Sequence, residues 1–99
     1  MRVLMIAKMD TEKANQAIQS NRLPEFMQTN LGRLQPESAY FTAVEGVRTA
    51  FIVFDLKEPA QMPSIAEPFF QELGANVTFS PAMNVEDVTR GLGPDYAAA

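Results

Sequence analysis

The stretch from Ala39 to Leu56, AYFTAVEGVRTAFIVFDL, constrains the fold more strongly than any other part of the chain. It is dominated by aromatic and β-branched side chains, which favour strands. Glu45 and Gly46 interrupt it, and glycine tolerates the positive φ that a two-residue hairpin turn requires. The stretch therefore predicts two antiparallel strands joined at Glu45-Gly46.

The turn also determines which side chains share a face of the hairpin, because a slip of one residue would exchange the two faces. One predicted face carries Tyr40, Thr42, Val44, Val47, Thr49 and Phe51. The other carries Phe41, Ala43, Arg48, Ala50, Ile52 and Phe54. Neither face is a run of charges, so we expect both to be covered. A chain of 99 residues is too short to cover both faces of its own sheet, and we expect a homodimer.

The chain before the hairpin predicts one strand and two helices. Residues 2–9 include an apolar run, which is typical of a short strand in the middle of a sheet. Apolar residues then recur at helical spacing over about 11–20 and 23–34. We expect two helices there because Pro24 cannot lie deep inside one helix without losing a hydrogen bond.

The chain after the hairpin predicts a helix, a strand and a last short helix. Helical spacing indicates a helix around residues 65–73, which Gly74 ends and which Pro68 should kink or divide. Alternating apolar and polar residues over 75–83 are typical of a half-buried strand. Asn84 supplies the side-chain cap of a final short helix.

The predicted order is β-α-β-β-α-β with a short C-terminal helix. Four antiparallel strands with helices on one face make an α+β sandwich of the ferredoxin-like class. We expect a single domain over residues 1–94 and a flexible tail over 95–99, because the tail has little to bury.

Composition argues against several classes of function. The chain has no Cys and no His, which removes thiolate nucleophiles, the commonest metal ligand and the commonest general base at neutral pH. Its net charge is −4 without a cluster of Lys or Arg, which argues against binding nucleic acid. No run approaches the roughly 20 apolar residues of a membrane span, and the first apolar run is too short for a secretory signal. We expect a cytoplasmic protein without a metal held by cysteine or histidine.

Four segments carry a resemblance to a known family: RVLMIAKM at 2–9, AYFTAVEGVRTAFIVFDL at 39–56, AEPFFQELGANV at 66–77 and PAMNVEDVTRGL at 81–92. In these segments the chain resembles the dimeric α/β-barrel superfamily, small ferredoxin-like proteins that include muconolactone-isomerase-like proteins and cofactor-free antibiotic-biosynthesis monooxygenases. The resemblance implies a homodimer in which two four-stranded sheets pack face to face and form an α/β barrel. Some relatives use a His-Asp pair, and haem-degrading relatives bind iron through histidine. This chain has no histidine, so neither arrangement is possible and the resemblance implies no catalytic residue.

One face of the predicted hairpin combines hydroxyl groups and a carboxylate with apolar side chains. It carries Tyr40, Thr42, Thr49, Phe51 and Asp55. Thr78 and Ser80 join this face if Val77 faces the helices. Such a mixture is typical of a pocket that orients a mostly apolar ligand. The alternative is a dimer interface or a barrel interior in which the hydroxyl groups bond to one another.

Two acidic residues are further candidates. Asp55, at a strand end, would be a general base if desolvation raised its pKa; otherwise it is a solvated turn residue or a helix cap. Glu67 lies between Ala66 and Pro68 on a largely apolar helix and would bind a ligand if it pointed into a cleft beside the proline. The alternative for Glu67 is an exposed side chain.

Two hypotheses of function follow. The first is a homodimer that binds a small, largely apolar organic molecule, or transforms it as a monooxygenase or isomerase, without metal or cofactor. The second is a non-enzymatic dimerisation or regulatory module with no ligand. The sequence leaves both open and names no substrate.

Overall fold

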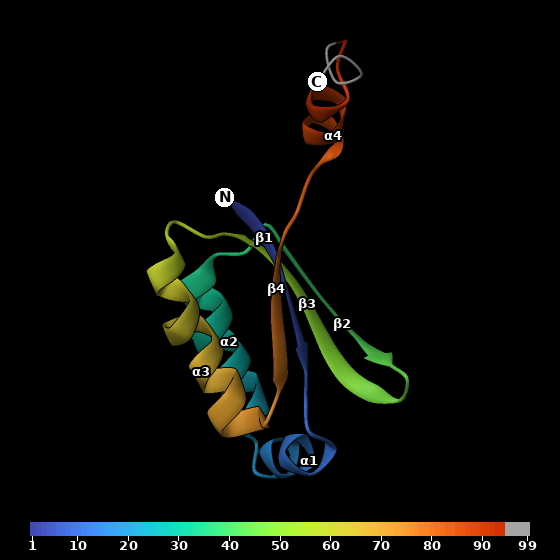
Figure 1. Ribbon diagram of the computed structural model, residues 1–99. Coiled ribbons are helices and arrows are strands. Elements are labelled where there is room, and N and C mark those ends of the chain that lie inside the picture. The colour runs from blue at the N-terminus through green and yellow to red at the C-terminus, as the bar shows by residue number, and fades with distance from the viewer. Residues whose placement is uncertain (95–99) are drawn as a thin grey trace.

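The computed structural model describes residues 1–94, which form a four-stranded antiparallel sheet and four α-helices (Figure 1). The strands are β1 (Arg2–Lys8), β2 (Ser38–Val44), β3 (Val47–Asp55) and β4 (Asn76–Pro81). The helices are α1 (Thr11–Gln19), α2 (Leu23–Leu34), α3 (Met62–Leu73) and α4 (Val85–Gly91), with a 3-10 turn η1 (Pro59–Gln61) before α3. The strand order is β2-β3-β1-β4, and the sheet is open. The predicted α+β class and antiparallel sheet are confirmed, and the predicted tail at 95–99 lies outside the described residues.

The β2–β3 hairpin has the register that the sequence predicts. Glu45 and Gly46 have φ angles of 52° and 78°, and positive φ at both positions is the geometry of a type I′ turn. Thr42 pairs with Thr49 across the hairpin, and the pairings at its two ends, Tyr40 with Phe51 and Val44 with Val47, are also those predicted. The two faces of the hairpin therefore carry the predicted sets of side chains.

Side chains at the helix ends explain where the helices begin and end. Asp10 caps α1, because its carboxylate accepts a hydrogen bond from the backbone N–H of Lys13 at 3.0 Å. Pro24 lies in the first turn of α2, where its missing N–H is not needed, so α1 and α2 are separate helices as predicted. Gly74 ends α3 with a positive φ of 54°, a conformation that glycine adopts without strain.

The sequence predicts that Pro68 kinks or divides helix α3; the helix is continuous through Pro68, so the proline does not divide it. A proline inside a helix removes one hydrogen-bond donor and crowds the preceding turn. Ala66, Phe69 and Leu73 bury one side of α3 in the core, and they lie on both sides of Pro68. Tertiary packing of this apolar side therefore outweighs the local cost of the proline.

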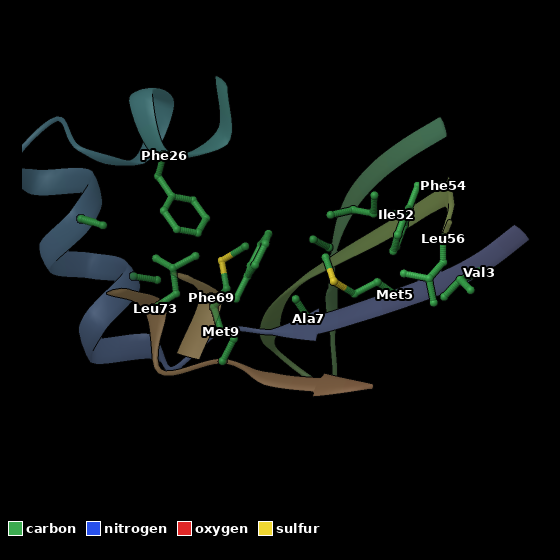
Figure 2. Packing of buried hydrophobic residues seen from close by; sticks show 14 residues of the cluster. Val3, Met5, Ala7, Met9, Phe26, Ile52, Phe54, Leu56, Phe69 and Leu73 are labelled. Atoms are coloured by element: carbon green, nitrogen blue, oxygen red, sulfur yellow. The ribbon is translucent and has the colours of Figure 1, made fainter. Parts of the chain in front are cut away.

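The core lies between the sheet and the helical layer, in which α2 and α3 lie along the sheet and α1 packs against both beyond the end of β1 (Figures 1 and 2). The sheet contributes Val3, Met5, Ala7, Ala50, Ile52 and Phe54, and the helices contribute Ala14, Ala17, Phe26, Phe69 and Leu73. Phe26 of α2 and Phe69 of α3 meet edge to face with ring centroids 5.0 Å apart, a favourable aromatic geometry. Phe79 of β4 also faces this layer, because its ring lies 6.5 Å from that of Phe54.

The opposite face of the sheet, called the helix-free face below, has no helix of residues 1–94 packed on it (Figure 1). Its centre is an apolar stripe of half-buried side chains from β1 and β3: Leu4, Ile6, Phe51 and Val53. Thr78 and Ser80 of β4 pair with Ile6 and Leu4, so they join this face as predicted. Tyr40 of β2 pairs with Phe51 and is 71% exposed.

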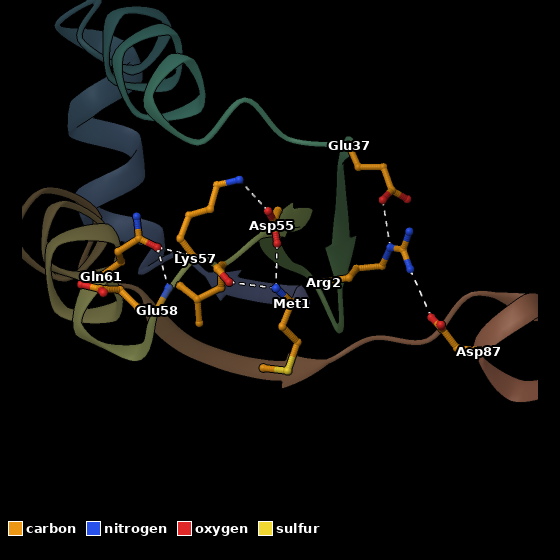
Figure 3. A network of polar contacts seen from close by, with 9 residues as sticks. Met1, Arg2, Glu37, Asp55, Lys57, Glu58, Gln61 and Asp87 are labelled. Atoms are coloured by element: carbon orange, nitrogen blue, oxygen red, sulfur yellow. Dashed lines mark hydrogen bonds and ion pairs between the residues drawn. The ribbon is translucent and has the colours of Figure 1, made fainter. Parts of the chain in front are cut away.

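Helix α4 stands away from the rest of the molecule (Figure 1). The chain measures 57 × 29 × 18 Å with a radius of gyration of 16.1 Å, whereas a compact chain of this length has about 12.6 Å. Arg2 links α4 to the sheet, donating to Asp87 of α4 at 3.3 Å and to Glu37, next to β2, at 2.9 Å (Figure 3). Val85 and Leu92 are 82% and 60% exposed, so the α4 segment leaves apolar side chains uncovered.

Candidate functional site

Two hollows lie where the helices meet the sheet. The larger, called the apolar groove below, has a volume of about 610 Å³ and runs between helices α1 and α2 and the β2–β3 hairpin. Its lining includes Ile18, Met27, Leu31, Phe41, Ala43 and Arg48. The groove exists because the hairpin extends past the helical layer: Phe41 points toward the helices and is still 51% exposed.

The smaller hollow, called the polar cavity below, has a volume of about 290 Å³ and lies between the end of β3, the end of α2 and the start of α3. Its polar lining consists of Asn30, Arg33, Gln35, Asp55, Lys57, Gln61 and Ser64. Gln61 shapes the wall, since its Oε1 accepts hydrogen bonds from the backbone N–H groups of Lys57 (2.8 Å) and Glu58 (3.1 Å) (Figure 3). The chain after β3 is thereby held against the start of α3.

Asp55 stands at the wall of the polar cavity with both carboxylate oxygens engaged (Figure 3). Oδ2 accepts from Nζ of Lys57 at 2.7 Å, and Oδ1 accepts from the amino group of Met1 at 2.7 Å. The hydrogen bond from Lys57, then that from the Met1 amino group, lower the pKa of Asp55 to about 2. The same pairing raises the pKa of Lys57. This direction is the opposite of the one that a general base at Asp55 requires.

The other predicted site residues are distributed over three places. Thr42 and Thr49 contribute to the apolar groove, and the Thr49 hydroxyl donates to the backbone oxygen of Val47 at 2.9 Å. Tyr40 and Phe51 lie on the helix-free face and line neither hollow. Glu67 is exposed on α3, where it accepts from Nε2 of Gln71 at 2.7 Å, and it lines neither hollow. The six candidates are therefore not brought together in one site.

Several residues of the polar cavity escaped the sequence reasoning. Arg33, Gln61 and Ser64 come from the ends of helices that are distant in the sequence, and no local pattern places them together. Asn30 does carry a local signal. It lies four residues after Phe26 and one before Leu31, so it is an amide on the buried side of α2, and it is indeed buried. Burying a polar side chain on the apolar face of a helix costs free energy unless it is hydrogen-bonded, so such a residue is a candidate for a binding site.

Two kinds of site are not found in the part of the chain that the structure describes. No three acidic side chains there gather closely enough to hold a metal ion. No helix within residues 1–94 combines the length and the apolar composition that crossing a bilayer requires.

Comparisons with known proteins add a structural likeness. No protein-family model matches the chain, and no curated protein matches its sequence. The solved structure of the uncharacterized protein TM1266 from Thermotoga maritima is similar, with a TM-score of 0.53 and 18% sequence identity over 83% of this chain and 95% of that one. At this identity the likeness shows a shared small fold of sheet and helices alone.

Proposed function

We propose that this protein binds a small, largely apolar organic molecule in the apolar groove. The observation that carries the proposal is the groove itself, about 610 Å³ in volume and lined mainly by hydrocarbon side chains. Pockets for small molecules span roughly 300–1,000 Å³ and have this composition, with a few polar groups that orient the ligand. Among the described residues that line the groove, Arg48 alone is charged, and it favours a ligand with an anionic group at one end.

The resemblance to the dimeric α/β-barrel superfamily extends the proposal to chemistry. That superfamily includes cofactor-free monooxygenases and muconolactone-isomerase-like proteins, so the bound molecule is a candidate substrate for either reaction. Mass spectrometry of the molecule after incubation with the protein, with and without oxygen, distinguishes an oxygenated, an isomerised and an unaltered ligand.

A thermal-shift screen with a library of small aromatic and aliphatic acids tests binding. A ligand that binds only the native state raises the melting temperature. Phe41→Gln, in the groove, should abolish that rise. Phe70→Gln is the matched control, because Phe70 is similarly exposed (42% against 51%) and lies on α3 outside the groove. If no compound stabilises the wild type, or if both variants respond equally, the groove is not the binding site.

We also propose that the fold is ferredoxin-like and that two copies pair through their helix-free faces into an α/β barrel. The order β2-β3-β1-β4 supports the first part. Three observations support the second: the apolar stripe on the helix-free face, the extended shape, and the uncovered apolar side chains of α4. A second sheet packed on this face would remove the stripe from water, the main driving force of such association.

The second candidate function is that of a non-enzymatic dimerisation or regulatory module that binds no ligand. The apolar stripe on the helix-free face favours it. Analytical ultracentrifugation and the thermal-shift screen together separate the two candidates. A dimer that no compound stabilises supports a dimerisation or regulatory module. A folded monomer at micromolar concentration would exclude the barrel dimer and the module with it.

A further inference from the structure

Asn30 presents an unused hydrogen-bond acceptor to the polar cavity. The residue is 8% exposed, and its Nδ2 donates to the backbone oxygen of Phe26 at 2.8 Å. A backbone oxygen can only accept, so the nitrogen of the amide must be the atom that faces Phe26. The amide oxygen Oδ1 then lies on the other side and has no hydrogen bond to any side chain or backbone group of residues 1–94.

The position of this oxygen is not sealed inside the protein. Within the described residues, every fully buried side-chain oxygen or nitrogen has a hydrogen-bond partner. The unpartnered Oδ1 of Asn30 must therefore reach open space, and the open space that Asn30 lines is the polar cavity. Water can reach the amide oxygen there, and a ligand that displaces this water loses affinity unless it donates a hydrogen bond in its place. The floor of the cavity thus favours a molecule that donates a hydrogen bond.

Arg33 supplies a free cation at the same cavity. It follows Asn30 by three residues on α2, so the two side chains lie on the same side of the helix, and both line the cavity. Arg33 makes no ion pair or side-chain hydrogen bond with residues 1–94, whereas Lys57 is held by Asp55 at 2.7 Å. Asp55 is in turn shared between Lys57 and the Met1 amino group, which leaves the guanidinium of Arg33 without a carboxylate.

We propose that the polar cavity binds a small organic acid with a hydroxyl or amino group beside its carboxylate, held by Arg33 and Asn30. The guanidinium is shaped for two parallel hydrogen bonds to a carboxylate. The Asn30 oxygen accepts from the neighbouring hydroxyl or amino group. A volume of about 290 Å³ equals roughly ten water molecules, which suits an acid of this size. The site shares no lining residue with the apolar groove, so it is independent of the function proposed there.

Nuclear magnetic resonance of the ¹⁵N-labelled full chain tests the proposal with lactate as the probe. Lactate should give saturable shifts of the Asn30 side-chain signals and of the Gln35 and Ser64 amides, without shifts at Phe41 or Ala43 in the groove. Propionate lacks the hydroxyl and should bind at least tenfold more weakly, because the Asn30 oxygen then stays unpaired. Lactamide lacks the charge and should also bind at least tenfold more weakly.

Two arginine variants test the role of the cation without touching the core. Arg33→Gln should weaken lactate binding at least tenfold. Arg22→Gln is the matched control, because Arg22 is exposed at the opposite end of α2 and lines neither hollow. Asn30→Leu should abolish the preference for lactate over propionate; if it fails to fold, Arg33→Gln still decides. Equal binding of lactate and propionate to the wild type, equal loss in both arginine variants, or no saturable shift up to about 100 mM lactate would overturn the proposal.

Discussion

The two faces of the sheet are made by the same strands and differ in what covers them. Met5 and Ile52 face the helices and have no exposed surface, whereas Ile6 and Phe51, the adjacent residues in the chain, are only partly buried on the helix-free face. Successive side chains in a strand point to opposite faces, so neighbours in one strand sample both environments. The contrast assigns the stability of the single chain to the covered face, and the other face is the one through which we propose that two copies associate.

The largest effect is expected on the covered face. Ile52→Ala should lower the free energy of unfolding by about 2–5 kcal/mol, because it leaves a cavity at a fully buried position. Urea denaturation followed by circular dichroism measures the change. A decrease in the free energy of unfolding below about 1 kcal/mol would show that the helices repack around the smaller side chain. It would contradict the idea that the covered face provides most of the stability.

On the helix-free face, Phe51→Lys should act on association instead of folding. In the proposed dimer, an unpaired ammonium group buried between two sheets costs several kcal/mol, so the dissociation constant of the variant should be at least a hundredfold higher than that of the wild type. Sedimentation measures this, and the unfolding midpoint of the dilute chain should change little. Phe70→Lys on the outer side of α3 is the control and should leave association unchanged. A Phe51→Lys dimer as tight as the wild type would place any interface elsewhere.

The ion pairs at Asp55 should give a smaller, pH-dependent contribution. Folding lowers the pKa of Asp55 from 3.8 to about 2 through Lys57 and the Met1 amino group, so folding favours the ionised form. The resulting stability is present above pH 3.8 and is lost as the pH falls through about 2. The melting temperature of Asp55→Asn should therefore lie below that of the wild type at pH 6, and the gap should close toward pH 2. A gap that is constant between these pH values would contradict the lowered pKa.

The smallest effect on overall stability is expected where Arg2 ties α4 to the sheet. Ion pairs that water can reach contribute little to folding, and both pairs of Arg2 are at least partly exposed, so Arg2→Gln should leave the urea midpoint nearly unchanged. Hydrogen exchange of the α4 amides should nonetheless become faster, because Asp87 loses its partner on β1. Glu37→Gln is the control, because it removes the ion pair between Arg2 and Glu37 and keeps the ion pair between Arg2 and Asp87. Equal exchange in both variants would show that Arg2 does not hold the helix.

Local patterns in the sequence predict most of the secondary structure. The hairpin follows from alternation around Glu45-Gly46, and the separation of α1 and α2 follows from Pro24, since both depend on residues close in the chain. Pro68 does not divide α3, because burial of Phe69 and Leu73, which no local pattern measures, outweighs the cost of the proline. Propensity is a weak guide wherever tertiary packing opposes it.

The hollows are harder to predict than the strands. The hairpin pattern places Thr42, Thr49 and Phe51 on one face, but it does not reveal that the hairpin extends past the helices and opens a groove. The polar cavity depends on how the ends of α2 and α3 meet β3, which joins side chains more than twenty residues apart, such as Arg33 and Lys57. Sequence periodicity shows which side chains share a face of one helix or strand. It does not predict the polar cavity, because that cavity forms where the ends of several helices and strands meet.

The left-handed turn at Glu45-Gly46 has a consequence for the order in which the chain acquires its structure. The turn closes a loop of two residues, so β2 and β3 meet at a small entropic cost, whereas β4 must find β1 across roughly seventy residues. We expect the hairpin to belong to the folding nucleus and β4 to dock late. Replacing Gly46 by Ala should then slow refolding, while truncating Val77 to Ala should chiefly speed unfolding, which stopped-flow kinetics would distinguish.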